Sequence, residues 1–218
     1  MPKLTCQEEN FVVIDEVFSE ENYYQFWKYF NHLPFVYTSS KGWLKVWKVT
    51  DGDVLQSTNY KRSNAPFNCE MDWLHQVVYS FAQKLENVIG KEGEDWQDIS
   101  FTPYLYPPGT KISWHNDGDF SGACIFYIHP NWNAHWGGEL LIAKTPKDKV
   151  PDQTDYMSRK DHSAFLNHYG LGHYITPLPN RLVFTKGDLW HCINRVDQAA
   201  GDNIRCSVVA FFKKIKDE

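Results

Sequence analysis

Trp114-His115-Asn116-Asp117 closes a short strand-like run that begins at Ile112, near the middle of the 218-residue chain. Side chains two residues apart on an extended chain point to the same side, so His115 and Asp117 share a face. The runs before and after this stretch also alternate apolar residues with a period of two, which is typical of strands. The predicted strands span residues 99–106, 112–114, 123–128, 139–143, 181–185, 189–193 and 204–212.

Upstream of these strands the hydrophobic period changes to that of helices. Ser19 is a predicted N-cap, and apolar residues recur with helical spacing over 23–30 before Pro34 ends the helix. A second helix is predicted over 71–88, with Gly90 at its end. Short strands are also predicted at 11–14 and 43–49. Helices followed by many short strands favour a mainly β fold, a β-sandwich or jelly roll with its supporting N-terminal helices packed on one sheet.

The composition restricts the class of protein. A net charge of −5 leaves no basic surplus for a phosphate backbone, so we expect no nucleic acid partner. No apolar run approaches the ~20 residues of a membrane span, so we expect no membrane partner. The first ten residues do not resemble a signal peptide. The five cysteines are odd in number, widely spaced and without a CxxC pair, which favours free thiols and a cytoplasmic location.

We expect the 218 residues to form a single domain. Helical support would occupy about residues 15–95 and a catalytic jelly roll about 99–213. The segment at about 144–172 interrupts the strands with prolines, charges and two histidines, and a third histidine follows directly at position 173. A loop of this length inside a compact domain is usually either functional or disordered, and we expect a lid-like insertion that closes over a ligand.

A second imidazole, His191, follows 76 residues after His115 in another predicted strand. Two histidines and one carboxylate on one face of an ion form the facial triad of non-haem Fe(II) oxygenases. The alternative interpretation is a surface turn at Asp117 and a core histidine bonded to a backbone carbonyl at His191. A metal would supply the partner that an inward-facing imidazole needs.

Arg205 and Ser207 share one face of the last predicted strand, which is otherwise apolar. An inward guanidinium is costly without an anion, and a carboxylate held by Arg205 beside the Ser207 hydroxyl would satisfy it. The alternative is that Arg205, at the start of the strand, still reaches water. Arg181 and Arg195 are rival candidates for an anion anchor.

The order of these residues resembles that of the Fe(II)- and 2-oxoglutarate-dependent oxygenases, and the surrounding motifs are most similar to the prolyl-4-hydroxylase-like branch. The resemblance covers about residues 99–212, half the chain. It is carried by His115-x-Asp117, His191, Arg205-x-Ser207, Tyr106-Pro107-Pro108-Gly109, Gly137-Gly138-Glu139-Leu140 and Arg181-Leu182-Val183-Phe184. One departure is Arg205-x-Ser207, since an Arg-x-Ser pair is better known from relatives outside that branch.

The resemblance implies a double-stranded β-helix (a cupin-like jelly roll) with Fe(II) at its mouth. His115, Asp117 and His191 would be the metal ligands and the catalytic centre. The cosubstrate 2-oxoglutarate would chelate the iron, and Arg205, helped by Ser207, would hold its far carboxylate. O2 would complete the reaction, which releases succinate and CO2.

A tyrosine on the strand before His115 would touch the same carboxylate. Tyr104 and Tyr106 share a face, and Tyr104, deeper in the strand, is the favoured candidate. Because Asp117 is present, we expect hydroxylation of an unactivated C–H bond, with desaturation and ring closure left open.

The expected substrate is a small molecule such as an amino acid or a biosynthetic intermediate, because the chain is compact and carries no recognition domain. The first alternative is a hydroxylase of a prolyl or other residue in a peptide or protein. The second alternative belongs to another class, a non-catalytic cupin-like metal-binding or sensor protein, since a fold does not determine a function.

Overall fold

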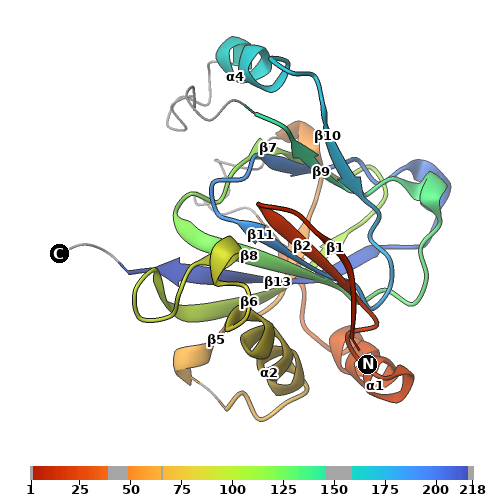
Figure 1. Cartoon of the computed structure of the whole chain (residues 1–218). Helices are drawn as coiled ribbons and strands as arrows, with labels where there is room; N and C mark the ends of the chain where they lie inside the picture. Colours follow the sequence, from red (N-terminus) through yellow and green to blue (C-terminus); the bar gives the residue numbers. More distant parts are fainter. Residues whose placement is uncertain (1, 39–48, 65, 146–158, 216–218) are drawn as a thin grey trace.

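The computed structural model describes residues 2–38, 49–64, 66–145 and 159–215. Its main feature is two antiparallel sheets that face each other, with helices on the outside of the larger one (Figure 1). The larger sheet follows the order β1-β2-β11-β8-β13-β6-β4-β3, with β5 also paired to β6. The smaller sheet follows the order β10-β9-β12-β7. Two facing sheets of short antiparallel strands are the predicted jelly roll.

The larger sheet takes strands from both ends of the chain. Its longest members are β6, β8 and β13, which pair side by side over most of their length. The strands are β1 (Lys3–Gln7), β2 (Phe11–Asp15), β3 (Val36–Tyr37), β4 (Leu55–Gln56), β5 (Tyr60–Lys61), β6 (Trp96–Tyr106), β8 (Phe120–Tyr127), β11 (Leu182–Lys186) and β13 (Arg205–Lys214).

The smaller sheet is built from β7 (Ile112–His115), β9 (Leu140–Ala143), β10 (Gly172–Ile175) and β12 (His191–Ile193). It brings together segments that lie far apart in the sequence, because β12 pairs with β9 on one side and β7 on the other. The extra residue in β7 between its pairings with His191 and Ile193 makes a β-bulge.

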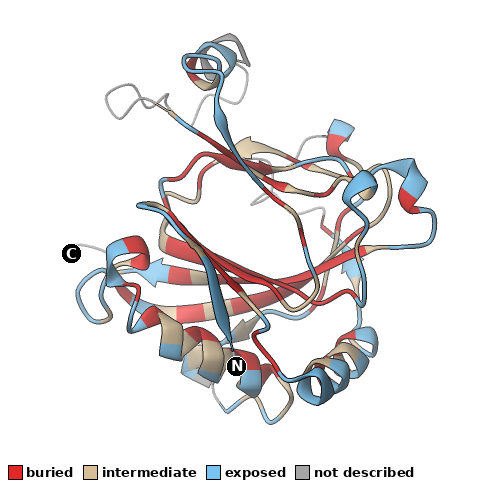
Figure 2. Cartoon of the chain, turned by 45° about the vertical axis from the view of Figure 1, so that its right-hand side comes forward, coloured by how far each residue is buried: buried red, intermediate tan, exposed pale blue. Residues whose placement is uncertain are grey.

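Alternation along the strands creates two separate apolar cores. On β13, Cys206, Val208, Ala210 and Phe212 face the helices, whereas Val209 on the other side faces the smaller sheet. Burial is concentrated in the two sheets, while the helices are exposed on their outer faces (Figure 2). The prediction that N-terminal helices cover one sheet is confirmed.

Helix α1 (Glu20–Asn31) begins where the sequence predicted, since Ser19 Oγ accepts a hydrogen bond from the Asn22 amide. Its buried residues, Phe26 and Phe30, lie one turn apart. The Phe26 ring packs edge-on against Phe126 of β8 at 5.8 Å. This contact holds the helix to the outer face of the larger sheet.

The helix predicted over 71–88 consists of two helices. Helix α2 (Met71–Ala82) ends at Ala82, and α3 (Glu86–Ile89) follows and ends at Gly90, which has a φ of +80°. The break lets Val88 and Ile89, both fully buried, turn onto the sheet. Burial of these two side chains therefore outweighs the helical propensity of the intervening residues.

Several other boundaries differ from the prediction. The strands β1 and β10 were missed because each is short and presents three or more exposed residues. The segment 144–172, predicted as a loop, contains α4 (Arg159–Leu166). The strand predicted from residue 189 begins at His191, since the Leu189 amide turns back to the Lys186 carbonyl. The strand predicted at 43–49 lies outside the described residues except for Val49, where a 3-10 turn (Val49–Asp51) begins.

No helix in the described part of the chain has both the length and the apolar character needed to cross a membrane.

Candidate metal centre

His115 and His191 lie directly opposite each other on neighbouring strands of the smaller sheet. Their rings are 4.3 Å apart between centroids, on the face that looks toward the larger sheet. Asp117 lies just beyond β7, with its two carboxylate oxygens 3.8 Å from His115 Nε2 and 3.6 Å from His191 Nε2. One potential ligand atom from each residue lies within 4.8 Å of the others. The structure thus brings together the three residues that the sequence predicted.

Both imidazoles are oriented in the same way. His115 Nδ1 lies 2.7 Å from the Ser113 carbonyl oxygen, and His191 Nδ1 lies 2.8 Å from the Leu189 carbonyl oxygen. A carbonyl only accepts, so Nδ1 must carry a proton, and in a neutral ring Nε2 is then the atom with the lone pair. Each ring therefore turns its lone pair toward Asp117, which is the tautomer that a metal ligand requires.

Burial sets the charges of this group. Loss of water, reinforced by the neighbouring His191, lowers the pKa of His115 to about 3. Burial also raises the pKa of Asp117 above its usual value. A neutral imidazole at neutral pH and a poorly solvated carboxylate are both stabilised by a cation between them. The donor set therefore fits a divalent metal ion of the Fe(II) type.

A close approach between two turns positions Asp117. The Phe120 amide donates to the Asp117 carbonyl, and the Asn116 side chain accepts from the Gly118 amide. Gly187 lies against this turn so closely that any side chain there would clash with the Phe120 carbonyl oxygen. Only glycine leaves room at this position, so Gly187 contributes to the placement of Asp117.

Arg205 is fully buried at the start of β13, which excludes the alternative that its charge reaches water. Its Cζ lies 4.7 Å from the centroid of the Tyr106 ring, and its Nε donates to the Gly138 carbonyl oxygen at 2.8 Å. A larger residue in place of Gly138 would clash with this side chain, because a Cβ there would lie 2.9 Å from Arg205 Cδ. The structure thus makes room for a guanidinium between the two sheets.

One nitrogen of this guanidinium, Arg205 Nη2, is buried without a hydrogen-bond partner, whereas Nη1 lies 3.5 Å from Ser207 Oγ. A buried charged donor without a partner costs free energy. A carboxylate next to Arg205 would supply two acceptors and a countercharge. The interior of the jelly roll therefore fits one end of a dicarboxylate.

Tyr127 is a site residue that the sequence did not reveal. Its ring centroid is 4.9 Å from Arg205 Cζ, and its buried hydroxyl has no partner. Strand pairing places Ser207 between Tyr127 and Tyr104, while Tyr106 lies opposite Arg205. The alternation of β8 shows that Tyr127 faces the interior, but only the pairing of β8 with β13 brings it to Arg205.

The placement of the tyrosines differs from the sequence preference. Tyr106 is the tyrosine of β6 whose ring lies beside the guanidinium, although the sequence favoured Tyr104. Tyr104 lies one alternate position further along the same face. The roles of Tyr104 and Tyr106 as carboxylate contacts stay predictions, and Tyr127 joins them as a candidate.

The rival anchors are engaged elsewhere. Arg181 donates to both carboxylate oxygens of Asp15, at 2.6 and 2.9 Å, and lowers the pKa of that carboxyl against the opposing effect of burial. Arg195 donates to the carbonyl oxygens of Gly109 and Thr50. The guanidinium groups of both arginines are therefore held by structural partners, whereas Nη2 of Arg205 has no hydrogen-bond partner.

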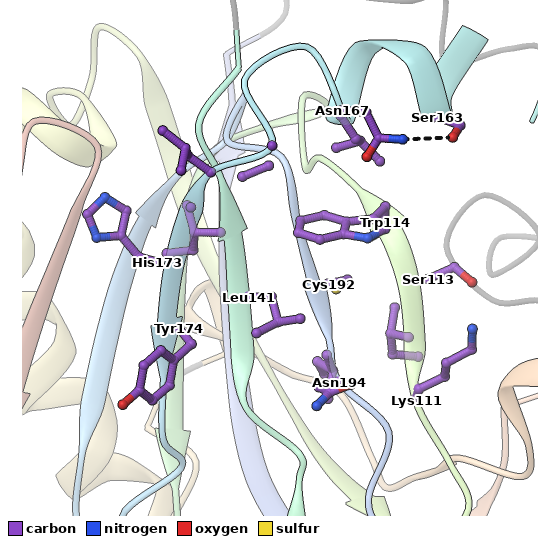
Figure 3. A pocket seen from close by; sticks show the side chains of 18 of the residues that line it. Lys111, Ser113, Trp114, Leu141, Ser163, Asn167, His173, Tyr174, Cys192 and Asn194 are labelled. Atoms are coloured by element: carbon purple, nitrogen blue, oxygen red, sulfur yellow. Dashed lines mark hydrogen bonds between the residues drawn. The ribbon is translucent and has the colours of Figure 1, made fainter. Parts of the chain in front are cut away.

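A groove of about 790 Å³ lies on the other face of the smaller sheet (Figure 3). Its floor includes Trp114, Leu141 and Cys192, which alternate with the inward-facing imidazoles. Beside it, Phe165 of α4 packs against Trp190 at 5.5 Å between ring centroids. The described part of the insertion thus lies on the face of the smaller sheet that is opposite to the imidazoles of His115 and His191. Its lid-like function stays a prediction.

The solved structures that are similar to this chain share its fold. A prolyl-4-hydroxylase from Pseudomonas putida is 14% identical with a TM-score of 0.61, and the match covers 95% of this chain and 94% of that one. A prolyl hydroxylase from Trichoplax adhaerens, solved with a hypoxia-inducible-factor peptide fragment, is 15% identical with a TM-score of 0.61, covering 94% and 84%. The 2-oxoglutarate-dependent epimerase SnoN of nogalamycin biosynthesis is 10% identical with a TM-score of 0.61, covering 94% and 77%.

Sequence comparison identifies the family. No curated protein sequence matches the chain significantly. A family model does match, that of the 2OG-Fe(II) oxygenase superfamily, over residues 99–213. This range contains both sheets' central strands, the His-Asp-His group and the buried arginine. The chain therefore belongs to the 2OG-Fe(II) oxygenase superfamily, and it is an oxygenase that depends on ferrous iron, 2-oxoglutarate and dioxygen.

Proposed function

We propose that this oxygenase hydroxylates an unactivated C–H bond of a small molecule, such as an amino acid or a biosynthetic intermediate, and releases succinate and CO2. His115, Asp117 and His191 are the proposed iron ligands, and Arg205 is the proposed anchor for 2-oxoglutarate. The observation that carries the proposal is the fully buried guanidinium of Arg205, whose Nη2 has no partner.

Arg205, the proposed anchor, would hold the far carboxylate of 2-oxoglutarate through its positive charge and through the direction of its N–H groups. A five-carbon dicarboxylate that chelates a metal at one end needs a cation for its other end, inside the same barrel. Arg205 offers a donor there. The hydroxyl groups of Ser207, Tyr106 and Tyr127 belong to residues next to the guanidinium and are further possible donors. The excess of donors over acceptors around this guanidinium selects an anion over a neutral group.

The proposed ligands act through orientation. The Ser113 and Leu189 carbonyls hold the two imidazoles with Nε2 toward Asp117. Bound iron, with 2-oxoglutarate and dioxygen, supplies the oxidising chemistry. The presence of Asp117, rather than a small residue, favours hydroxylation as the outcome, with desaturation and ring closure as the alternatives.

Access to the proposed centre limits the part of the substrate that reaches it to a small group. The side chains of His115 and Asp117 are 12% exposed, and that of His191 is 6% exposed. An opening this narrow suits a small molecule or one protruding side chain of a peptide. Among the similar structures, SnoN is described as an enzyme of nogalamycin biosynthesis and the Trichoplax enzyme as a complex with a peptide. A residue in a peptide is thus the competing substrate class.

The non-catalytic cupin-like alternative is set aside because the matching family model is one of oxygenases. A cytoplasmic location remains part of the proposal. It rests on the five cysteines, all of which are free thiols.

The test is a screen for succinate release and 2-oxoglutarate consumption with iron-loaded protein. One panel contains amino acids and biosynthetic intermediates, and the other contains proline-bearing peptides. We expect stimulation by members of the first panel and none in Arg205→Met protein. Stimulation by peptides alone would replace the proposed substrate class, and a wild-type protein that neither binds nor consumes 2-oxoglutarate would refute the proposal.

A further inference from the structure

Asp51 is fully buried, although it belongs to a three-residue turn (Val49–Asp51) outside both sheets. A buried carboxylate costs free energy unless polar groups compensate it. Its compensating partners lie on β7, the strand that carries His115. Asp51 is 64 residues away from His115 in the sequence, so nothing local links the two residues.

Asp51 accepts hydrogen bonds from backbone amides that a neighbouring strand would otherwise bind. Its backbone carbonyl accepts from the Lys111 amide at 2.9 Å, and its Oδ2 accepts from the Ser113 amide at 3.1 Å. Its Oδ1 accepts from the Ser113 hydroxyl at 3.0 Å and lies 3.5 Å from Lys111 Nζ. Figure 3 shows Lys111, Ser113 and Trp114 along the same stretch of chain, which enters β7 at Ile112. Asp51 therefore occupies the free edge of β7.

The edge needs this support because β7 has only one strand partner among the described residues. In the sheet order it stands last, next to β12. The β-bulge in β7 lies between the residues paired with His191 and Ile193, which is where Ser113 is located. The Ser113 amide consequently bonds to the Asp51 carboxylate rather than to β12.

Ser113 connects this edge to the metal centre. Its carbonyl oxygen accepts from His115 Nδ1 at 2.7 Å. The position of the Ser113 peptide therefore sets both the tautomer and the direction of the His115 ring. A carboxylate that fixes Ser113 acts on His115 through one intervening residue.

His191 provides an internal comparison. It also donates through Nδ1 to a carbonyl two residues earlier, that of Leu189. Its strand, however, lies between β9 and β7 and is held by both. Any effect that passes through Asp51 should thus reach His115 and spare His191.

We propose that Asp51 is a positioning residue of the metal centre, which anchors Ser113 and thereby orients the His115 imidazole. This inference rests on the proposed role of His115 as an iron ligand. Loss of a partner that orients a metal-bound histidine typically weakens metal affinity by roughly 10- to 100-fold. We expect a loss of this size in Asp51→Ala protein.

Two milder variants keep the test valid if Asp51→Ala protein does not fold. Asp51→Asn keeps one acceptor oxygen for Ser113 and should lose less affinity than the alanine variant. Ser113→Ala removes only the hydroxyl contact and keeps the backbone links, so its loss should also be smaller. Asp53→Asn is the matched control. Asp53 lies two residues after Asp51 and is exposed, so the variant removes the same charge without removing a buried contact.

The first measurement is ¹⁵N NMR of the imidazole nitrogens in metal-free protein, which reports the tautomer of each histidine without activity. We expect Asp51→Ala to disturb the Nδ1-protonated form of His115 and to leave His191 unchanged. The second is the dissociation constant for Fe(II) under oxygen-free conditions.

Unchanged His115 resonances and an unchanged dissociation constant in the Asp51 variants would overturn the inference, as would equal disturbance of both histidines. Failure of the proposed function is distinguishable from this result. In that case wild-type protein itself would bind no Fe(II), while the resonances of His115 would still report on Asp51.

Discussion

Replacing Arg205 by methionine is expected to separate the stability of this protein from its binding of 2-oxoglutarate. The guanidinium is fully buried, bonds through Nε to the Gly138 carbonyl, and leaves Nη2 without a partner. A buried charge without a full set of partners lowers the stability of the free protein, and a bound anion would compensate it. Methionine has a similar length and carries no charge.

The two effects have opposite signs. In the absence of 2-oxoglutarate, exchange of a poorly compensated buried ion for an apolar side chain is neutral or stabilising by about 1–4 kcal/mol. Loss of the hydrogen bond to the Gly138 carbonyl lowers the unfolding free energy by about 1 kcal/mol and so offsets part of this gain. In its presence, loss of two charge-assisted hydrogen bonds at about 1.5–3 kcal/mol each weakens binding by roughly 10²- to 10⁴-fold.

Urea unfolding measures the first effect, and calorimetric titration of 2-oxoglutarate into metal-loaded, oxygen-free protein measures the second. Arg181→Met is the matched control, because Arg181 forms a bidentate pair with Asp15. That variant should lose about 2 kcal/mol of unfolding free energy, less than the about 3–5 kcal/mol of a fully buried pair because the Asp15 side chain is 22% exposed, and it should keep its affinity for 2-oxoglutarate.

Two outcomes would refute this reasoning about Arg205. Arg205→Met protein that binds 2-oxoglutarate with wild-type affinity would show that the anchor lies elsewhere. Arg205→Met protein that is destabilised by more than about 3 kcal/mol would show that the guanidinium is a structural element, as a broken buried pair would be.

Three further predictions concern the surroundings of the site. Gly187→Ala should displace the turn that carries Asp117, because of the clash with the Phe120 carbonyl, and should lower Fe(II) affinity in equilibrium dialysis; unchanged affinity would contradict the role given to Gly187. Tyr127→Phe should stabilise the free protein by about 1 kcal/mol, since it removes a buried hydroxyl without a partner, and should weaken 2-oxoglutarate binding in calorimetry. Burial lowers the pKa of His129 to about 4 against the opposing hydrogen bond to the Pro177 carbonyl, so His129 binds more proton in the unfolded state than in the folded state between pH 6.5 and 4. His129 should therefore contribute a fall of up to about 3 kcal/mol in unfolding free energy as the pH drops through this range, in addition to the contribution of His115, and His129→Gln should remove that part of the dependence in urea titrations at several pH values.

Local patterns in the sequence predicted much of the fold. Strand alternation identified β13, and helical spacing with Ser19 as a cap identified α1. These features depend on residues close together in the chain. Where burial on a distant sheet decided the outcome, as in the break before Ile89, the local pattern predicted one helix too long.

Part of the site was also predictable. His115 and Asp117 are neighbours in the sequence, and the family resemblance supplied His191 and Arg205. Strand pairing supplied the rest. Tyr127 approaches Arg205 only because β8 pairs with β13, which no local signal encodes.

Asp51 is the clearest case of a residue that sequence patterns could not reveal. It follows the segment 43–49 that the sequence predicted as a strand, and nothing in its neighbourhood indicates a buried carboxylate. Its role is recognised only from the sheet order, in which β7 has one strand neighbour among the residues that the structure describes. Edge strands of this kind depend on tertiary contacts that propensity does not describe.

The most direct test of the metal centre is the iron content of the protein after oxygen-free equilibrium dialysis. We expect one Fe(II) per chain for the wild-type protein and none for Asp117→Ala or His191→Ala. Asp119→Ala, which changes an exposed carboxylate two residues beyond the proposed ligand, should keep its iron. Full iron content in the Asp117→Ala and His191→Ala proteins would contradict the central claim that these side chains hold the catalytic metal.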